Sequence, residues 1–212
     1  MRFDHRRTHE GAARPVRYLT NRSSGKMGYA LAQAAAHAGH RVTLVSGPTN
    51  LHLPHGVDFV PVLTAQDMFE AVGSRIGGAD AAIMAAAVAD YRPAEAFPEK
   101  MKKGAERIAI EFVRTPDILG SARGTFGFRG VLAGFAAETE NVRENARAKL
   151  ERKGCDLICA NDVAQPGIGF DAEENALLLL FKDGAEHALE KAPKEDLARE
   201  IIEICERLAE PG

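Results

Sequence analysis

Apolar and amphipathic stretches alternate along the chain and predict an α/β protein. Residues 19–47 contain a short apolar strand, a Ser/Gly turn, an alanine-rich helix that ends near Gly39, and a second strand. Further strands are predicted over 57–62, 80–86, 107–113, 130–136, 156–162 and 175–181, and the strand over 80–86 is predicted to be buried on both faces. Further helices are predicted over 65–76, over 139–153 and from Pro193 onward.

The order of these elements predicts a doubly wound, mostly parallel sheet, because strands that alternate with helices favour parallel pairing. The last third adds strands without an intervening helix, so we expect a mixed sheet edge there. We find no repeat, low-complexity segment or linker, and residues 1–212 are predicted to form one domain.

Composition narrows the class of protein. A chain of 212 residues can bury a sizeable core, and its formal net charge of -3 argues against a general nucleic-acid coat. The beginning, MRFDHRR, lacks the apolar stretch of a secretory signal, and the longest apolar run, 81–89, is too short to span a bilayer. We therefore expect a cytoplasmic protein that binds neither nucleic acid nor membrane.

The three cysteines, Cys155, Cys159 and Cys205, fit a reducing compartment and offer no disulfide framework. Cys155 and Cys159 have the spacing of half a metal site. No second Cys/His pair with ligand spacing accompanies them, so we interpret them as buried cysteines and predict no metal ligand among the side chains.

The opening strand–turn–helix unit is similar to the start of a short-chain dehydrogenase. A glycine turn and a helix N-terminus suit a bound phosphate, whichever nucleotide carries it. However, Asn21 replaces the first glycine of that pattern, and the strand over 41–48 ends without the acidic residue that holds a ribose. No tyrosine is followed four residues later by lysine. A nicotinamide-dependent oxidoreductase is therefore a minor alternative.

Polar residues that follow the strands suggest a site for a nucleoside triphosphate. Asp90 is predicted to end a buried strand, and the loop after it carries Lys100, Lys102 and Lys103. Together these residues could hold a metal-bound phosphate or form a solvated basic loop. Thr115 is predicted as the N-cap of a helix that begins at Pro116.

Three later positions leave two interpretations open. Phe135 could face a base or lie in the core. Lys149 and Lys153, one helical turn apart, could grip a polyanion or flank Glu151 on a solvated surface. Asn161 follows a strand at the same rim of the sheet.

Taken together, the order and spacing of these stretches resemble the phosphopantothenoylcysteine synthetase family, the ligase step of coenzyme A synthesis, in its stand-alone bacterial type. The resemblance runs from Val16 to about Leu180. The matching stretches are VRYLTNRSSGKMGYALA, VTLVSGPT, AAVADYRP, EKMKK, TPDIL, GFAAETE, AKLERKGCDLICANDV and GFDAEENALLLL.

The resemblance implies a Rossmann-like homodimer that uses CTP and Mg²⁺, with ATP as the nucleotide of eukaryotic relatives. The implied reaction joins 4'-phosphopantothenate to cysteine. The carboxylate attacks the α-phosphorus of CTP, and the amine of cysteine then displaces CMP.

The resemblance also implies roles for individual residues. Lys100 would offset charge on the triphosphate, and Asn21 would donate to the carbonyl oxygen during attack by cysteine. The implied nucleotide contacts are Met84, Ala85, Ala86, Asp90, Lys100, Pro116, Asp117, Ile118, Leu119, Phe135, Lys149 and Lys153. The implied phosphopantothenate contacts are Arg17, Asn21, Ser23, Ser24, Gly25, Ala86, Ala87 and Asn161.

Residues 1–15 depart from the family pattern, because MRFDHRR stands where an apolar strand and a glycine-rich turn are expected. A degenerate member that binds nucleotide without turnover is therefore the second alternative. No stretch resembles a flavin-dependent decarboxylase, so we expect no FMN and a separate decarboxylase in the pathway.

Overall fold

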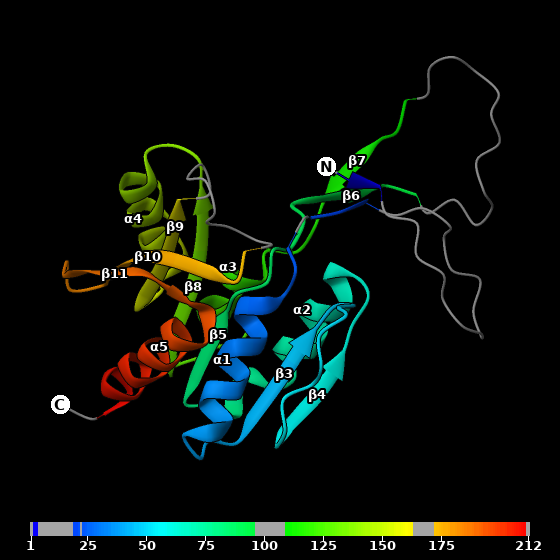
Figure 1. Cartoon of the computed structure of the whole chain (residues 1–212). Helices are drawn as coiled ribbons and strands as arrows, with labels where there is room; N and C mark the ends of the chain where they lie inside the picture. The colour runs from blue at the N-terminus through cyan, green and yellow to red at the C-terminus, as the bar shows by residue number, and fades with distance from the viewer. Residues whose placement is uncertain (1, 4–18, 22, 96–108, 163–171, 211–212) are drawn as a thin grey trace.

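The computed structural model describes residues 2–3, 19–21, 23–95, 109–162 and 172–210. Its main sheet has five strands in the order β11-β10-β9-β8-β5 (Figure 1). These strands are β5 (Ala81–Met84), β8 (Val131–Glu138), β9 (Leu157–Asp162), β10 (Glu174–Phe181) and β11 (Glu186–Pro193). β5, β8 and β9 are parallel, and β10 and β11 add antiparallel. The predicted α/β fold with a mixed C-terminal edge is confirmed.

In the described part of the chain, three two-stranded sheets accompany the main sheet. β3 and β4 are parallel, whereas the pairs β1–β2 and β6–β7 are antiparallel. The β6–β7 ribbon projects away from the main sheet (Figure 1). The bounds are β1 (Arg2–Phe3), β2 (Leu19–Thr20), β3 (Val42–Ser46), β4 (Val57–Pro61), β6 (Tyr91–Pro93) and β7 (Phe112–Arg114).

Helices cover both faces of the main sheet. Side chains alternate along β8, so Val131 and Ala133 pack in the same cluster as α1 (Lys26–His37) and α5 (Lys194–Ala209). Leu132 and Ala136 point the other way, into a cluster with α3 (Ile118–Gly124) and α4 (Val142–Lys153). Two further helical segments are α2 (Ala65–Gly73) and the short 3₁₀ helix η1 (Ile76–Gly78). In the described part of the chain, no helix has the length and apolar character needed to cross a membrane.

Several sequence predictions were wrong in detail. The strand over 80–86 is not buried on both faces, because Ala81 is exposed and the rest of β5 is only half-buried. The strand predicted over 107–113 is seen only as β7, and residues 107–108 lie outside the described residues. β11 was not predicted, because half of its sequence EHALEKAP is polar and the pattern carries little alternation. Pro193 is the N-cap of α5 rather than its first helical residue.

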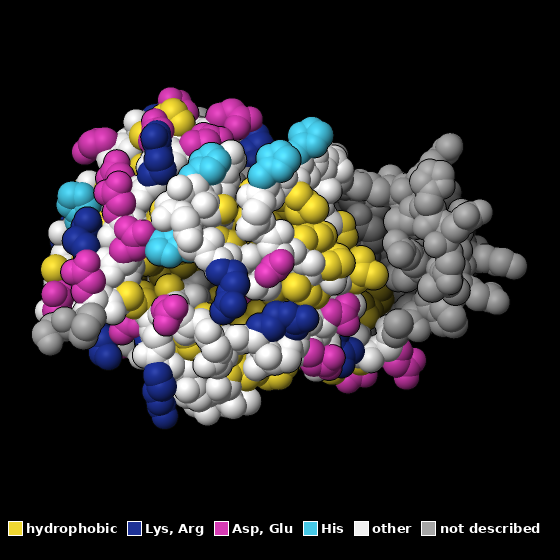
Figure 2. All heavy atoms as spheres, turned by 90° about the horizontal axis from the view of Figure 1, so that it is seen from below, with side chains coloured by type: hydrophobic (Ala, Val, Ile, Leu, Met, Phe, Trp, Pro, Cys, Tyr) yellow, Lys and Arg dark blue, Asp and Glu magenta, His cyan; other side chains and the backbone are white. Residues whose placement is uncertain are grey.

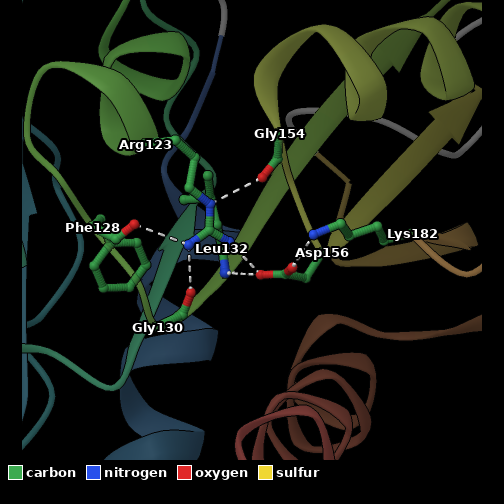
Figure 3. A network of polar contacts seen from close by, with 7 residues as sticks. All are labelled: Arg123, Phe128, Gly130, Leu132, Gly154, Asp156 and Lys182. Atoms are coloured by element: carbon green, nitrogen blue, oxygen red, sulfur yellow. Dashed lines mark hydrogen bonds and ion pairs between the residues drawn. The ribbon is translucent and has the colours of Figure 1, made fainter.

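The Arg123 guanidinium joins α3 to the amino ends of β8 and β9 (Figure 3). Its Nη1 donates to the carbonyls of Phe128 and Gly130, and its Nε donates to the carbonyl of Gly154. Its Nη2 bonds Asp156 Oδ2 at 2.5 Å. The same carboxylate oxygen accepts the backbone N–H of Leu132. One planar cation thus fixes the loop before β8, the end of α4 and the start of β9.

We expect Arg123→Met to lower the free energy of unfolding by about 3 kcal/mol, because it removes the cationic partner of the partly buried Asp156 carboxylate and the side-chain donor to three carbonyls. Arg123→Lys should restore little of the lost free energy of unfolding, since an ammonium cannot reproduce the fixed, forked donor geometry of a guanidinium. Urea denaturation measures both variants. Arg207→Met, an exposed change on α5, should stay within about 0.5 kcal/mol of the wild type. An Arg123→Met variant as stable as this control would contradict the assignment.

Candidate functional site

A large open cavity, about 1490 Å³ in volume, extends along α1, β3, β5, α3 and α4. All predicted nucleotide contacts that the structure describes line it: Met84, Ala85, Ala86, Asp90, Pro116, Asp117, Ile118, Leu119, Phe135, Lys149 and Lys153. Lys100 lies outside the described residues. The sequence therefore predicted a set of residues that the fold brings together, although their contacts with a nucleotide stay a prediction.

The start of α1 offers backbone N–H groups to this cavity. Gly25 is the N-cap, with φ of 79°, and the Ser24 hydroxyl accepts the N–H of Lys26 at 3.5 Å. A side chain at Gly25 would be strained at this φ and would meet the methyl group of Thr49 at 2.9 Å. Gly25, Ser23 and Gly28 line the cavity. A helix N-terminus carries a partial positive charge and suits a phosphate.

The segment after β5 is tied to two neighbouring segments. The Asn21 amide donates to the carbonyl of Ala87 at 2.6 Å, which connects this segment to the start of α1. The Thr115 hydroxyl donates to the carbonyl of Ala89 at 2.5 Å, and its N–H donates to the carbonyl of Asp90. Thr115 is therefore not the N-cap that was predicted. Asp90 follows β5 after an irregular stretch rather than ending the strand itself.

Asp117, not Thr115, is the N-cap of α3, and its carboxylate accepts the N–H of Gly120 at 2.9 Å. Pro116 precedes the helix, contrary to the prediction. The Asp117 carboxylate also forms an ion pair with Lys153 of α4. Burial alone would raise the pKa of Asp117, but the contacts with Lys153 and Gly120 outweigh it and hold that pKa below its usual value.

Lys149 points from α4 toward β8, where its ammonium donates to the carbonyl of Phe135 at 2.7 Å. Burial lowers the pKa of Lys149, against an opposing effect of Glu138. The side chain of Lys153 is only 16% exposed. The interpretation that these lysines sit on a solvated surface is therefore wrong. The ring of Phe135 is half-buried against the core and also lines the cavity, and its contact with a base stays a prediction.

Asn161 is buried at the carboxyl end of β9, where it pairs in register with Ala137. Among the described residues its Oδ1 has no hydrogen-bond partner, which is unusual for a buried amide. Nearby Asn175, also buried, instead accepts the N–H of Ala176 at 3.1 Å. An unsatisfied acceptor at the rim where ligands of such sheets bind is a candidate contact for a donor group of a substrate.

The predicted phosphopantothenate contacts are only partly brought together. Ser23, Gly25 and Ala86 line the cavity. Asn21, Ser24, Ala87 and Asn161 are not among the residues that line it, and Arg17 lies outside the described residues. Sequence reasoning overlooked two cavity-lining residues, Ser46, which ends β3, and Gly47, which follows it. The Gly-Pro turn after this strand was the available signal, because ligands bind beyond strand ends.

A sequence profile of the DNA/pantothenate metabolism flavoprotein C-terminal domain matches residues 8–208. The chain belongs to this family. Its relatives include the coenzyme A biosynthesis bifunctional protein CoaBC of Vibrio parahaemolyticus serotype O3:K6, 50% identical over 196 residues. The same-named proteins of Escherichia coli K12 and Bacillus subtilis 168 are 50% and 47% identical over 173 and 190 residues.

These alignments cover 92%, 80% and 89% of this chain, but only 49%, 43% and 47% of the relatives. The chain therefore spans about half the length of the family members it matches. Because those relatives are bifunctional, the comparisons do not support the stand-alone type or the separate decarboxylase that the sequence suggested.

Solved family structures share the fold. The C-terminal domain of a coenzyme A biosynthesis bifunctional protein CoaBC has a TM-score of 0.76 and 42% identity, over 91% of this chain and 87% of that one. The DNA/pantothenate metabolism flavoprotein from Streptococcus pneumoniae has a TM-score of 0.77 over 92% and 93% of the two chains. At 21% identity, this second likeness bears on the fold alone.

The site's chemistry suits a magnesium triphosphate. The lysines and the N-terminus of α1 could balance phosphate charge, and Asp90 and Asp117 line the same cavity. Mg²⁺ often takes its ligands from substrate phosphates and water rather than from a cage of protein side chains. Among the described residues no cluster of three His, Cys, Asp or Glu side chains forms such a cage.

The predicted burial of the cysteines is confirmed. Burial raises the pKa of Cys155 to about 11 and that of Cys205 to about 12. Burial also raises the pKa of Cys159 well above its usual value. The thiols therefore stay protonated at neutral pH and serve in packing.

We expect Asn161→Leu to leave the free energy of unfolding unchanged or to raise it by about 1 kcal/mol, because it removes a buried acceptor that has no donor. Asn175→Leu is the matched control at a buried amide whose oxygen is satisfied, and it should cost about 1 kcal/mol. Urea denaturation compares the two. Equal losses in both variants would show that the Asn161 oxygen is satisfied in solution.

Proposed function

We propose that the chain is a phosphopantothenate–cysteine ligase of coenzyme A synthesis that uses CTP. One observation supports this most: the described residues expected to contact the nucleotide line one cavity, with two lysines turned inward. The family and the names of the relatives support the pathway.

In the first step of the proposed reaction, a carboxylate oxygen of 4'-phosphopantothenate attacks the α-phosphorus of CTP. The bond to the β-phosphate breaks, pyrophosphate leaves with the electron pair, and an acyl-cytidylate forms. The N-terminus of α1, Lys149 and Lys153 would hold the phosphates. Mg²⁺, when bound, would supply further positive charge on the triphosphate. Lys100 remains a candidate for the same task.

In the second step, the amine of cysteine attacks the carbonyl carbon, loses a proton, and displaces CMP to leave an amide. Asn21 is the candidate donor to the carbonyl oxygen. Its amide nitrogen already donates to the carbonyl of Ala87, which fixes the side chain beside a cavity-lining segment. A donor held in place before the reaction stabilises developing charge without reorganising.

The nucleotide base would lie near Phe135 and the backbone of 116–119, which leaves CTP and ATP as alternatives. Asn161 would accept a hydrogen bond from an amide or hydroxyl group of phosphopantothenate. The cytoplasmic location stays a prediction that cell fractionation tests.

The homodimer also stays a prediction. Tyr91 and Phe112 on the β6–β7 ribbon are 47% and 40% exposed, as expected of apolar side chains that a second copy would cover. Sedimentation equilibrium tests this state.

We expect pyrophosphate release when the protein is mixed with 4'-phosphopantothenate, cysteine, Mg²⁺ and CTP, because the cavity offers the cations that the first step requires. Parallel reactions with ATP, GTP and UTP identify the base. CTP binding in calorimetry without pyrophosphate release would support the degenerate member instead. A shift in NADPH fluorescence on mixing would support the oxidoreductase alternative.

We expect Lys149→Met to weaken CTP binding by about 10-fold to 100-fold, the value of a charge-assisted hydrogen bond to phosphate. Isothermal titration calorimetry measures it. Lys182→Met removes an exposed lysine that pairs with Asp156 and does not line the cavity, so it should leave CTP affinity unchanged. If both variants bound CTP like the wild type, Lys149 would not contact the nucleotide.

A further inference from the structure

The loop after β3, residues 47–51, folds back onto the start of α1. β3 runs beside α1 in the opposite direction, so the end of β3 lies near the beginning of the helix (Figure 1). A Cβ atom at Gly25 would lie 2.9 Å from Cγ2 of Thr49 and 3.7 Å from Cδ1 of Leu51. Two side chains of this loop therefore pack directly against the glycine at which α1 begins.

The hydroxyl group of Thr49 makes a second contact with α1. Thr49 Oγ1 accepts the backbone N–H of Leu51 at 3.4 Å and donates to the hydroxyl oxygen of Tyr29 at 3.0 Å. Tyr29 is only 8% exposed, and its backbone N–H donates to the carbonyl of Gly25 at 3.1 Å. Thr49 thus contacts both ends of the first helical turn, Gly25 through its methyl group and Tyr29 through its hydroxyl group.

The loop is itself attached to a paired strand. β3 pairs with β4 along its whole length. Beyond the pair, the N–H of Val62 donates to the carbonyl of Ser46, the last residue of β3, at 3.0 Å. Pro48 follows two residues later and fixes one backbone dihedral of the loop. The β3–β4 pair therefore holds Thr49 in place, and Thr49 in turn contacts the first turn of α1.

This turn carries donors that a phosphate group would use. The first N–H groups of a helix have no acceptor within the helix, and both Gly25 and Tyr29 line the cavity. The N–H of Gly25 reaches the Ser23 hydroxyl only at 3.4 Å, and that of Lys26 lies 3.5 Å from its serine acceptor. Both distances exceed the usual length of such bonds, so a phosphate oxygen would displace the hydroxyls at little cost.

The chain as a whole offers a phosphate little long-range attraction. Its formal net charge is -3, and the face seen from below shows Lys and Arg side chains interspersed with Asp and Glu (Figure 2). Steering of an anion requires a surface of one sign. Phosphate binding at α1 would therefore depend on how accurately the N–H groups of its first turn are placed.

We propose that Thr49 and Tyr29 are positioning residues of the ligase, which hold the first turn of α1 in the orientation that binds a phosphate group of CTP or of 4'-phosphopantothenate. We call this pair the clamp. The inference rests on the proposed function, since that function supplies the two phosphate-bearing substrates. Donors at the turn would contact the phosphate before and during the reaction alike, so loss of the clamp should raise KM and leave kcat nearly unchanged.

The test compares Thr49→Val and Tyr29→Phe, which each remove one hydroxyl group and nearly keep the shape of the side chain. We expect each variant to weaken the binding of one of the two substrates by about fivefold, the effect of one neutral hydrogen bond. Isothermal titration calorimetry with CTP, and separately with 4'-phosphopantothenate, identifies that substrate. In the pyrophosphate assay, KM for the same substrate should rise by about fivefold, with kcat within about twofold of the wild type.

Three further variants separate positioning from a loss of stability. The double variant should lose no more affinity than either single one, because both changes remove the same bond. Thr49→Ser keeps the hydroxyl and should bind within about twofold of the wild type. Thr64→Val is the matched control: it removes the hydroxyl that caps α2 by accepting the N–H of Asp67 at 3.0 Å, outside the cavity wall. It should lower stability in urea denaturation at least as much as Thr49→Val and leave both affinities unchanged.

Wild-type affinity for both substrates in the two single variants, full additivity in the double variant, or an equal loss of affinity in Thr64→Val would overturn the clamp. A wild-type protein that binds the substrates but releases no pyrophosphate would contradict the ligase instead, and the affinities of the variants would still decide on the clamp. A wild-type protein that binds neither substrate would contradict both.

Discussion

The fork of hydrogen bonds from Arg123 is the constraint on which the geometry of the site depends. Arg123 belongs to α3, and it bonds the carbonyl of Gly154 at the end of α4 and the Asp156 carboxylate before β9. It therefore fixes two short helices against each other and against the sheet. The ion pair of Asp117 and Lys153 joins the same two helices at the cavity. The shape of the site therefore depends on the hydrogen bonds of Arg123, a residue that does not line the cavity.

Partial burial of the Lys149 ammonium costs free energy that a bound anion would offset. Lys149 is partly buried, its pKa is lowered, and its ammonium is held by a neutral carbonyl. Lys153 is paired, but its partner is an N-cap that also stabilises α3. A buried ammonium that faces a carbonyl is stabilised less than one that faces a phosphate. A phosphate bound beside Lys149 would therefore interact with its ammonium more strongly than the Phe135 carbonyl does.

Sequence patterns predicted the parts of this picture that depend on local periodicity and on strand order. Helix α1 and strand β8 are strongly patterned, and the polar residues after strands gather because parallel strands end at one rim. The N-cap of α3 was misassigned, since Thr115 and Asp117 are both good caps and only the tertiary bond to Ala89 decides between them. The direction of Lys149 depends on packing against β8, which helical spacing cannot reveal.

The segment 85–90 connects the fold of the sheet with the candidate site. β5 leads directly into this segment, whose carbonyls hold Asn21 and Thr115. The two accepting residues, Ala87 and Ala89, lie two positions apart, so one short stretch of backbone sets the place of Asn21 and of the turn before α3. A donor placed by the fold stabilises developing charge without reorganising. The geometry of the backbone after β5 therefore bears directly on the proposed role of Asn21.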